Sequence, residues 1–140
     1  MIHLIYISSA TSWPSTQDLT LLLAQSRSRN LRQNITGMLI YNNATYMQVL
    51  EGEPDDVHDI FASICRDPRN NGVVKLLDEA IAGRDFPQWS MGFKQLDDFA
   101  DEPPPPGFVD VFHGALDRLQ LLSNQSVAID MLLSFARMNR

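Results

Sequence analysis

Apolar and polar positions alternate along the chain with periods that predict strands and helices in turn. Residues 2–8 are apolar at nearly every position, which is typical of a central strand covered on both faces. Residues 35–41 and 46–50 predict two further strands, and Asn42-Asn43 between them predicts a tight turn because asparagine tolerates left-handed backbone geometry. Residues 73–82 and 88–93 predict the last two strands.

Two helices are predicted between these strands. Pro14 and Ser15 open the first helix, which we expect to fray at residues 27–30. The second begins at Pro54 and stops before Pro68. The inward-facing residues expected from a helical repeat are Leu19, Leu22, Leu23 and Ser26 in the first helix and Val57, Ile60, Phe61 and Ile64 in the second.

The order of these elements predicts an α/β fold of the α+β kind. A β-α-β-β-α-β-β order matches the ferredoxin-like plan, in which right-handed crossovers place both helices on one face of the sheet. Four consecutive prolines predict a semi-rigid spacer. We therefore expect a domain at 1–96, an acidic, proline-rich linker at 97–106 and a helical cap or output segment at 107–140. Its helices, at 107–119 and 124–138, should cover the opposite sheet face. In the second of these helices the inward-facing residues should be Val127, Met131, Leu132 and Phe135.

Composition limits the classes of function. The chain has 140 residues, of which 44% are hydrophobic and 20% charged, as in a soluble globular protein. A formal charge of −6 disfavours nucleic acid and anionic membrane surfaces as partners. There is no long apolar run and no basic region ahead of one, so we expect a cytoplasmic protein without a membrane span. Cys65, the single cysteine, is expected to be a small core residue.

Polar side chains inside apolar strands are the best candidates for chemistry. Gln48 lies in the middle of residues 46–52, and Tyr6 lies in the first strand. A buried carboxamide without partners costs about 1–3 kcal/mol, so these side chains hold a polar ligand or each other. The first and third strands are neighbours in a ferredoxin-like sheet, so the two residues can meet. Asn30, at the end of the first helix, completes the constellation with Trp89 and Met91.

Several separated segments resemble the BLUF family, which contains flavin-binding blue-light sensors. The similarity covers about residues 1–95. The segments are Leu4-Ile5-Tyr6-Ile7-Ser8-Ser9, Arg29-Asn30, Ile35-Thr36-Gly37-Met38-Leu39-Ile40-Tyr41, Met47-Gln48-Val49-Leu50-Glu51-Gly52, Asp67-Pro68-Arg69 and Phe86-Pro87-Gln88-Trp89-Ser90-Met91.

The resemblance implies a bound flavin, FAD or alternatively FMN, with its ring edge-on to the sheet between the two helices. Tyr6 would donate an electron and a proton, and Gln48 would bridge the phenol to the flavin N5 and O4 edge. Asn30 would satisfy the pyrimidine end, and Trp89 or Met91 would lie near the glutamine. The other implied flavin-binding residues are Leu22, Leu50 and Ile64 beside the ring, and Arg29, Asp67 and Arg69 toward the ribityl and phosphate end. No metal ligand is implied.

Three positions depart from the common pattern of the family. Arg29 stands where many members have asparagine, Asn34 where glycine is frequent, and Asn70 where histidine is frequent. These positions concern the flavin tail and a loop, so they bear on the choice between FAD and FMN.

The implied function is a photoreceptor without catalysis of its own. Light would rearrange Gln48, and the C-terminal helices would pass the change to a separate partner, such as a cyclic-nucleotide phosphodiesterase or a transcriptional regulator. We also expect a homo-oligomer.

Two other classes of function remain open on the residues alone. A hydrolase of the acylphosphatase type needs a backbone cradle and an arginine after the first strand, and residues 8–14 offer neither. A ligand-free interaction module fits the acidic surface and apolar tail. Taken singly, Tyr6 could be an ordinary core tyrosine, Asn30 a helix cap, and Trp89 and Met91 packing residues.

Overall fold

The order of strands and helices matches the expected plan. The structure, a computed structural model, describes residues 1–12, 15–42, 44–86 and 92–95, and near the C-terminus residues 127, 128, 131, 132 and 134. The elements are β1 (Ile2–Ala10), α1 (Thr16–Arg32), β2 (Thr36–Asn42), β3 (Thr45–Gly52), α2 (Pro54–Arg66), β4 (Asn70–Ala80) and β5 (Gly92–Gln95).

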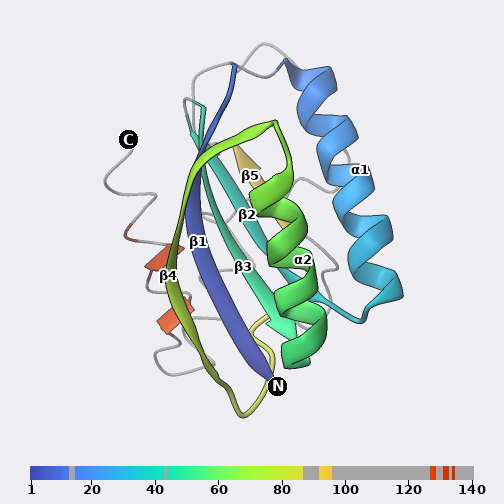
Figure 1. The fold of residues 1–140 in the computed structure, drawn as a ribbon, viewed down its shortest axis with the longest axis vertical. Helices are drawn as coiled ribbons and strands as arrows, with labels where there is room; N and C mark the ends of the chain where they lie inside the picture. Colours follow the sequence, from blue (N-terminus) through green and yellow to red (C-terminus); the bar gives the residue numbers. More distant parts are fainter. Residues whose placement is uncertain are drawn as a thin grey trace.

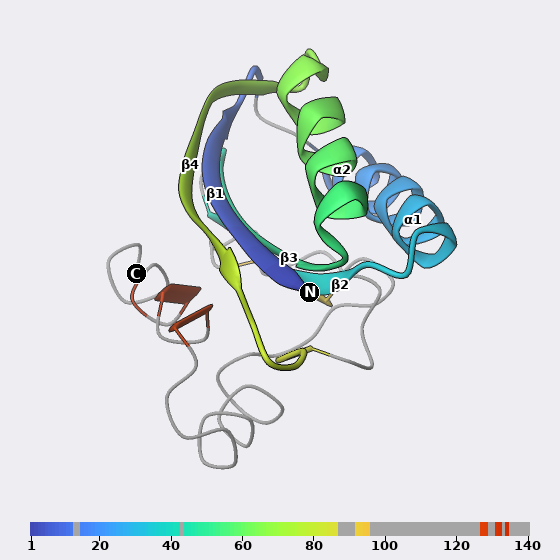
Figure 2. The same ribbon diagram turned by 60° about the horizontal axis from the view of Figure 1, so that its bottom comes forward.

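The strands form one sheet in the order β4-β1-β3-β2-β5. The first four run antiparallel to their neighbours, and β5 runs parallel to β2. Both long helices lie on one face of the sheet (Figures 1 and 2). The ferredoxin-like prediction is therefore confirmed, and the register places Tyr6 of β1 directly opposite Gln48 of β3.

Each face of the sheet carries its own apolar core because side chains alternate along a strand. On the helix side, Leu4 and Tyr6 of β1 pack with Leu23 of α1 and Ile60 of α2. The other face buries Ile5, Met38, Ile40, Met47 and Val49 together with Phe86, Ala128 and Leu132. The first strand is thus covered on both sides, as its continuous apolar pattern predicts.

The described C-terminal residues are helical and contact the second core. Ala128 and Leu132 are fully buried there, so this part of the chain covers the face that the helices leave open. Leu132 is buried and Met131 partly buried, as predicted, but Val127 was expected to face inward and is 47% exposed. Ala128, one position later, is buried in its place, and Phe135 lies outside the described residues. The helix predicted at 107–119 lies outside the described residues.

The first helix is longer than its sequence suggests. A capping box fixes its start: the Ser15 hydroxyl accepts the Asp18 N–H at 3.1 Å, and the Asp18 carboxylate accepts the Ser15 N–H at 3.0 Å. The prediction that this helix frays at residues 27–30 is wrong, because the helix continues to Arg32. Ser26 and Asn30 both face the core, and this packing holds the last turns.

The second helix follows its apolar pattern closely. Val57, Ile60 and Ile64 are buried and Phe61 is partly buried, as predicted. Cys65 was expected in the core but is exposed. It follows Ile64 by one position, which turns its side chain about 100° away from the apolar stripe.

Other strand bounds differ from the prediction by one to three residues. In the turn between β2 and β3, Asn43 lies outside the described residues and Ala44 carries a left-handed φ of 63°. The fourth strand begins at Asn70, and β5 covers 92–95, whereas residues 88–91 of the predicted last strand lie outside the described part.

Candidate functional site

A pocket of about 240 Å³ lies between the sheet and the two helices. Its floor comes from β1, β2 and β3, one wall from α1, and the other from the end of α2 and the start of β4. Its lining residues are Tyr6, Leu22, Gln25, Ser26, Arg29, Arg32, Leu39, Tyr46, Gln48, Ile64, Asp67, Arg69 and Asn70. The structure thus brings seven residues expected from the sequence into one place: Tyr6, Leu22, Arg29, Gln48, Ile64, Asp67 and Arg69.

Tyr6 and Gln48 form the buried polar centre of this pocket. Both side chains are 3% exposed, and the Tyr6 hydroxyl donates a hydrogen bond to Gln48 Oε1. Burial raises the pKa of the Tyr6 phenol above its ordinary value, and the charge of Arg29 only partly offsets this effect. The phenol therefore keeps its proton at neutral pH. The sequence left open whether these two side chains bind each other or a polar ligand. In the structure they bind each other, and both also line a cavity.

Apolar side chains flank this pair. Leu22, Leu39 and Ile64 line the same pocket from α1, β2 and α2. The Tyr6 ring also contacts Phe61, with a centroid separation of 5.6 Å and an interplanar angle of 52°. Apolar walls around a few placed hydrogen-bonding groups are typical of cofactor pockets.

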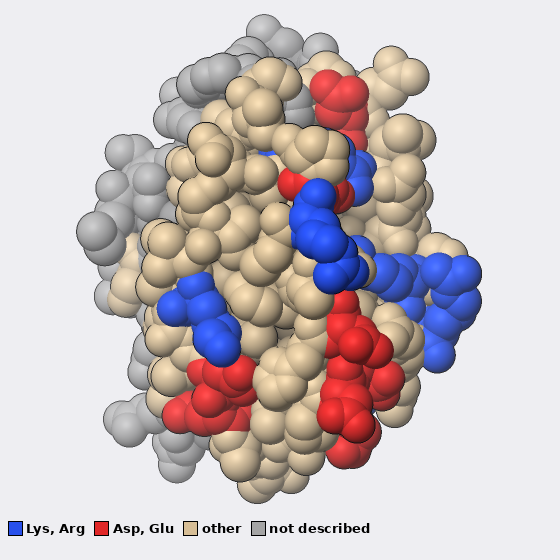
Figure 3. All heavy atoms as spheres, in the orientation of Figure 1, with Lys and Arg blue, Asp and Glu red and all other residues tan. Residues whose placement is uncertain are grey.

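The mouth of the pocket is basic. Arg69 Nη2 lies 2.6 Å from Asp67 Oδ2, and Arg69 Nη1 donates to Gln25 Oε1 at 3.0 Å. The hydrogen bond from Arg69 holds the pKa of Asp67 below its ordinary value. Arg29 and Arg32 line the pocket from α1. Basic side chains gather over the C-terminal parts of α1 and α2, and a group of acidic ones lies toward the N-terminal end of α2 (Figure 3). Such a mouth favours an anionic group.

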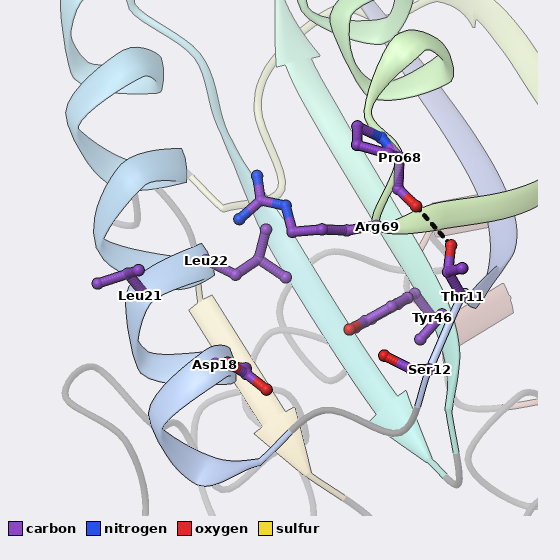
Figure 4. Close-up of a pocket in the computed structure, with 9 residues that line it drawn as sticks. Thr11, Ser12, Asp18, Leu21, Leu22, Tyr46, Pro68 and Arg69 are labelled. Atoms are coloured by element: carbon purple, nitrogen blue, oxygen red, sulfur yellow. Dashed lines mark hydrogen bonds between the residues drawn. The ribbon is translucent and has the colours of Figure 1, made fainter.

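A second cavity of about 390 Å³ adjoins the first (Figure 4). Leu22, Tyr46 and Arg69 line both cavities, and Arg69 extends across toward Leu22 of α1. The far side is closed by residues 10–12, where the Thr11 hydroxyl donates to the carbonyl of Pro68. Ligand pockets in proteins usually measure about 300–1,000 Å³. The two cavities together fall within that range.

Among the described residues, Asn30 and Leu50 were expected in the pocket but do not line it. Asn30 is fully buried beside Arg29, and its carbonyl accepts the N–H groups of Gln33 and Ile35 at 3.2 and 2.8 Å. Leu50 is fully buried in the helix-side core. Trp89 and Met91 lie outside the described residues. Their roles toward a flavin stay predictions.

Sequence reasoning missed several lining residues and one buried charge. Leu39 and Tyr46 contribute to the pocket, and both could have been found from Gln48. Tyr46 shares a strand face with Gln48, and Leu39 is the residue opposite Gln48 on β2. Asn70 connects the Ser8 hydroxyl, at 3.3 Å, to the Ile64 carbonyl, at 3.2 Å. Glu51 is fully buried although it is acidic.

Within the described residues, the structure contains neither a helix long and apolar enough to cross a membrane nor a group of three or more His, Cys, Asp or Glu side chains placed to bind a metal ion.

Comparison with known proteins gives a family match. The model described as "BLUF: Sensors of blue-light using FAD" matches residues 1–92. A photoactivated adenylate cyclase subunit beta from Euglena longa is 34% identical over 102 residues, which is 72% of this chain but 12% of the relative. The blue light- and temperature-regulated antirepressor BluF of Escherichia coli K12 is 31% identical over 59% of this chain and 21% of its own length. This chain thus spans a small part of these relatives.

Solved structures give the same result. The dark-state structure of BlrB, a BLUF protein, is 34% identical with a TM-score of 0.66, covering 68% of this chain and 72% of its own. Klebsiella pneumoniae BlrP1, solved with FMN and cyclic diGMP, is 29% identical with a TM-score of 0.75, covering 97% of this chain and 34% of its own.

Proposed function

Because the chain belongs to the BLUF family of blue-light sensors that use FAD, we propose that it is a photoreceptor that binds a flavin in the pocket between α1, α2 and the sheet. The family match confirms the resemblance inferred from separated sequence segments. The observation that carries the proposal for this chain is the buried hydrogen bond from Tyr6 to Gln48 at the pocket floor. An oxidisable phenol beside a carboxamide is the arrangement that such a sensor needs.

The proposed cofactor is FAD, with FMN as the alternative. The family description names FAD, and the relative BlrP1 was solved with FMN. The cavity beyond Arg69 supports FAD because it offers space for a tail longer than that of FMN. Arg29 and Arg69 would lie near the phosphates, and Leu22 and Ile64 would contact the ring. Asn30 and Leu50 are proposed to contribute to the same site from the adjoining core.

The proposed mechanism is a change of hydrogen-bond partners at Gln48. The flavin, when bound, supplies absorption of blue light and a site for an electron. Tyr6 would release one electron and its phenolic proton and recover both as the dark state returns. Gln48 accepts the phenol's hydrogen bond through Oε1, so rotation of the amide would present Nε2 instead. Each exchanged bond is worth about 1 kcal/mol, which is enough to bias a two-state equilibrium.

The proposed output lies in a separate protein. The relatives pair light sensing with different outputs, since their names describe adenylate cyclases and an antirepressor, and BlrP1 was solved with cyclic diGMP. The family itself consists of sensors. We therefore propose a partner such as a cyclic-nucleotide phosphodiesterase or a transcriptional regulator, with residues 107–140 as the output segment beyond the 97–106 linker. A cytoplasmic homo-oligomer with Trp89 or Met91 near Gln48 completes the proposal.

Replacement of Tyr6 tests this function. Tyr6→Phe should keep the yellow colour of bound flavin, because it removes only one hydroxyl, and should lose the reversible red-shifted state. Tyr41→Phe is a matched control, since Tyr41 is also buried on the helix-side face but does not line the pocket. The control should keep both properties. A normal photocycle in Tyr6→Phe would refute the mechanism.

A further inference from the structure

Glu51 is a buried carboxylate with no role in the pocket. It lies near the end of β3 and is 0% exposed. Side chains alternate along a strand, so Gln48 faces the helices while Glu51 faces the opposite side of the sheet. A buried charge is retained only where other groups compensate it. The compensating groups identify what Glu51 holds.

The carboxylate of Glu51 binds the connection between β4 and β5. Its Oε2 accepts the N–H of Asp85 at 2.6 Å, and its Oε1 accepts the N–H of Phe86 at 2.9 Å. The Thr36 hydroxyl also donates to Oε1, at 2.9 Å. Burial raises the pKa of Glu51, and these three donors act in the opposite direction. Short bonds to two consecutive amides fix this segment to β3.

Arg84 strengthens the same attachment. Its Nη1 donates to the Thr36 hydroxyl at 2.8 Å and to the Glu51 carbonyl at 3.0 Å, and its Nη2 donates to the Asn34 carbonyl at 2.7 Å. The segment 84–86 is therefore tied to β2 and β3 through both side-chain and backbone groups.

Phe86 continues this connection to the C-terminal part of the chain. It is 1% exposed and belongs to the core that contains Val49 of β3, Ala128 and Leu132. Six positions after Phe86, Gly92 begins β5 beside Met38 of β2. A displacement of β3 would consequently reach the C-terminal residues through a chain of contacts: the carboxylate, the amide of Phe86 and its ring.

We propose that Glu51 is a positioning residue that couples Gln48 to the C-terminal segment by making residues 84–86 follow the movement of β3. This inference rests on the proposed photoreceptor function. Gln48 and Glu51 lie three residues apart on one strand but face opposite sides of the sheet. The strand can thus receive a change on the flavin side and deliver it to the other side. Without the carboxylate, the segment could stay in place while β3 shifts.

Glu51→Gln tests the coupling in the full chain loaded with FAD. Glutamine keeps the shape of glutamate but replaces one acceptor oxygen with a donor, which would then face a backbone N–H. Glu53→Gln is the matched control, because the same change is made two residues away on a side chain that is 67% exposed. Hydrogen exchange is measured in peptides that contain residues 84–86 and 127–134, in darkness and under blue light, together with the absorption spectrum.

We expect wild type and Glu53→Gln to change exchange in both peptides on illumination. In Glu51→Gln, residues 84–86 should exchange about tenfold faster in darkness, because charge-assisted hydrogen bonds are lost. The red shift should persist while the light-induced change at 127–134 disappears. Thr36→Val removes one donor to the carboxylate and one acceptor of Arg84. It should reduce that change partially and serves if Glu51→Gln does not fold.

Three results would overturn the coupling. The first is an unaltered light-induced change at 127–134 in Glu51→Gln, which would make Glu51 a static clamp. The second is an unaltered change in Thr36→Val, should Glu51→Gln not fold. The third is a wild-type protein with a red shift but no light-dependent exchange in either peptide. Absence of any red shift in wild type would instead overturn the proposed function.

Discussion

Gly37 is predicted to be irreplaceable because β2 and β3 approach each other closely there. It lies on β2 opposite Leu50 of β3. A Cβ at this position would stand 1.9 Å from the Val49 carbonyl oxygen and 2.9 Å from its carbonyl carbon. Real Cβ contacts essentially never fall under 3.0 Å, and the obstructing atoms are backbone that cannot rotate away. Gly37→Ala must therefore push the two strands apart.

The expected cost follows from the two effects of that separation. Overpacking a well-ordered interior costs about 1–3 kcal/mol. Each weakened hydrogen bond between the strands adds about 1 kcal/mol. We expect Gly37→Ala to lower the free energy of unfolding by about 3 kcal/mol in total. The melting temperature should fall by roughly 10 °C. The strain acts next to Gln48, so the fraction of protein with bound flavin should fall as well.

Urea unfolding of Gly37→Ala and Gly83→Ala measures this effect. Gly83 is a matched control because a Cβ there has no atom within 4 Å. The control should unfold within about 0.5 kcal/mol of wild type, as is usual for surface substitutions. Equal unfolding midpoints for the two variants would refute the close approach between the strands, and with it the register that places Gln48.

Three further predictions concern the pocket and its surroundings. Burial raises the pKa of Tyr46 to about 12. The protonated phenol therefore contributes its full stability below a pH of about 10, the pKa of an unfolded tyrosine, and this contribution is lost as pH rises through the folded pKa. Urea midpoints measured across this pH range should decline less steeply in Tyr46→Phe than in wild type. Asp67 has a lowered pKa because Arg69 donates a hydrogen bond to it, so its contribution to stability is lost as pH falls through the folded pKa. Asp67→Asn should lower the free energy of unfolding by less than about 1 kcal/mol at neutral pH and should remove this acid sensitivity. An undiminished loss of stability in acid would contradict the assignment. Exposed Cys65 should react with a small thiol reagent in the folded protein at nearly the unfolded rate without loss of flavin absorption, whereas reaction only after unfolding would show that it is buried.

The central contact could be predicted from the sequence because it follows from regular geometry. Alternation along strands and the ferredoxin-like order together place Tyr6 opposite Gln48. The errors are mostly shifts of one position. Cys65 and Val127 each lie one residue from a buried position, and one residue rotates a helical side chain by about 100°. The end of α1 was missed because local sequence favours fraying while burial of Asn30 holds the helix.

Other parts of the site depend on contacts that sequence patterns do not encode. Glu51 binds the backbone of Asp85, 34 positions away, and any residue type at that position would offer the same N–H. The attachment of Arg69 to Gln25 likewise joins the start of β4 to α1 across 44 positions. Such side-chain contacts become visible only once the fold is known.

The most direct test of the central claim is the absorption spectrum of the purified chain, loaded with FAD and recorded in darkness and after blue illumination. A photoreceptor built on Tyr6 and Gln48 should show flavin bands in darkness, displaced to longer wavelength by light and restored when the light is removed. Protein that binds no flavin, or flavin bands that illumination leaves in place, would contradict the account.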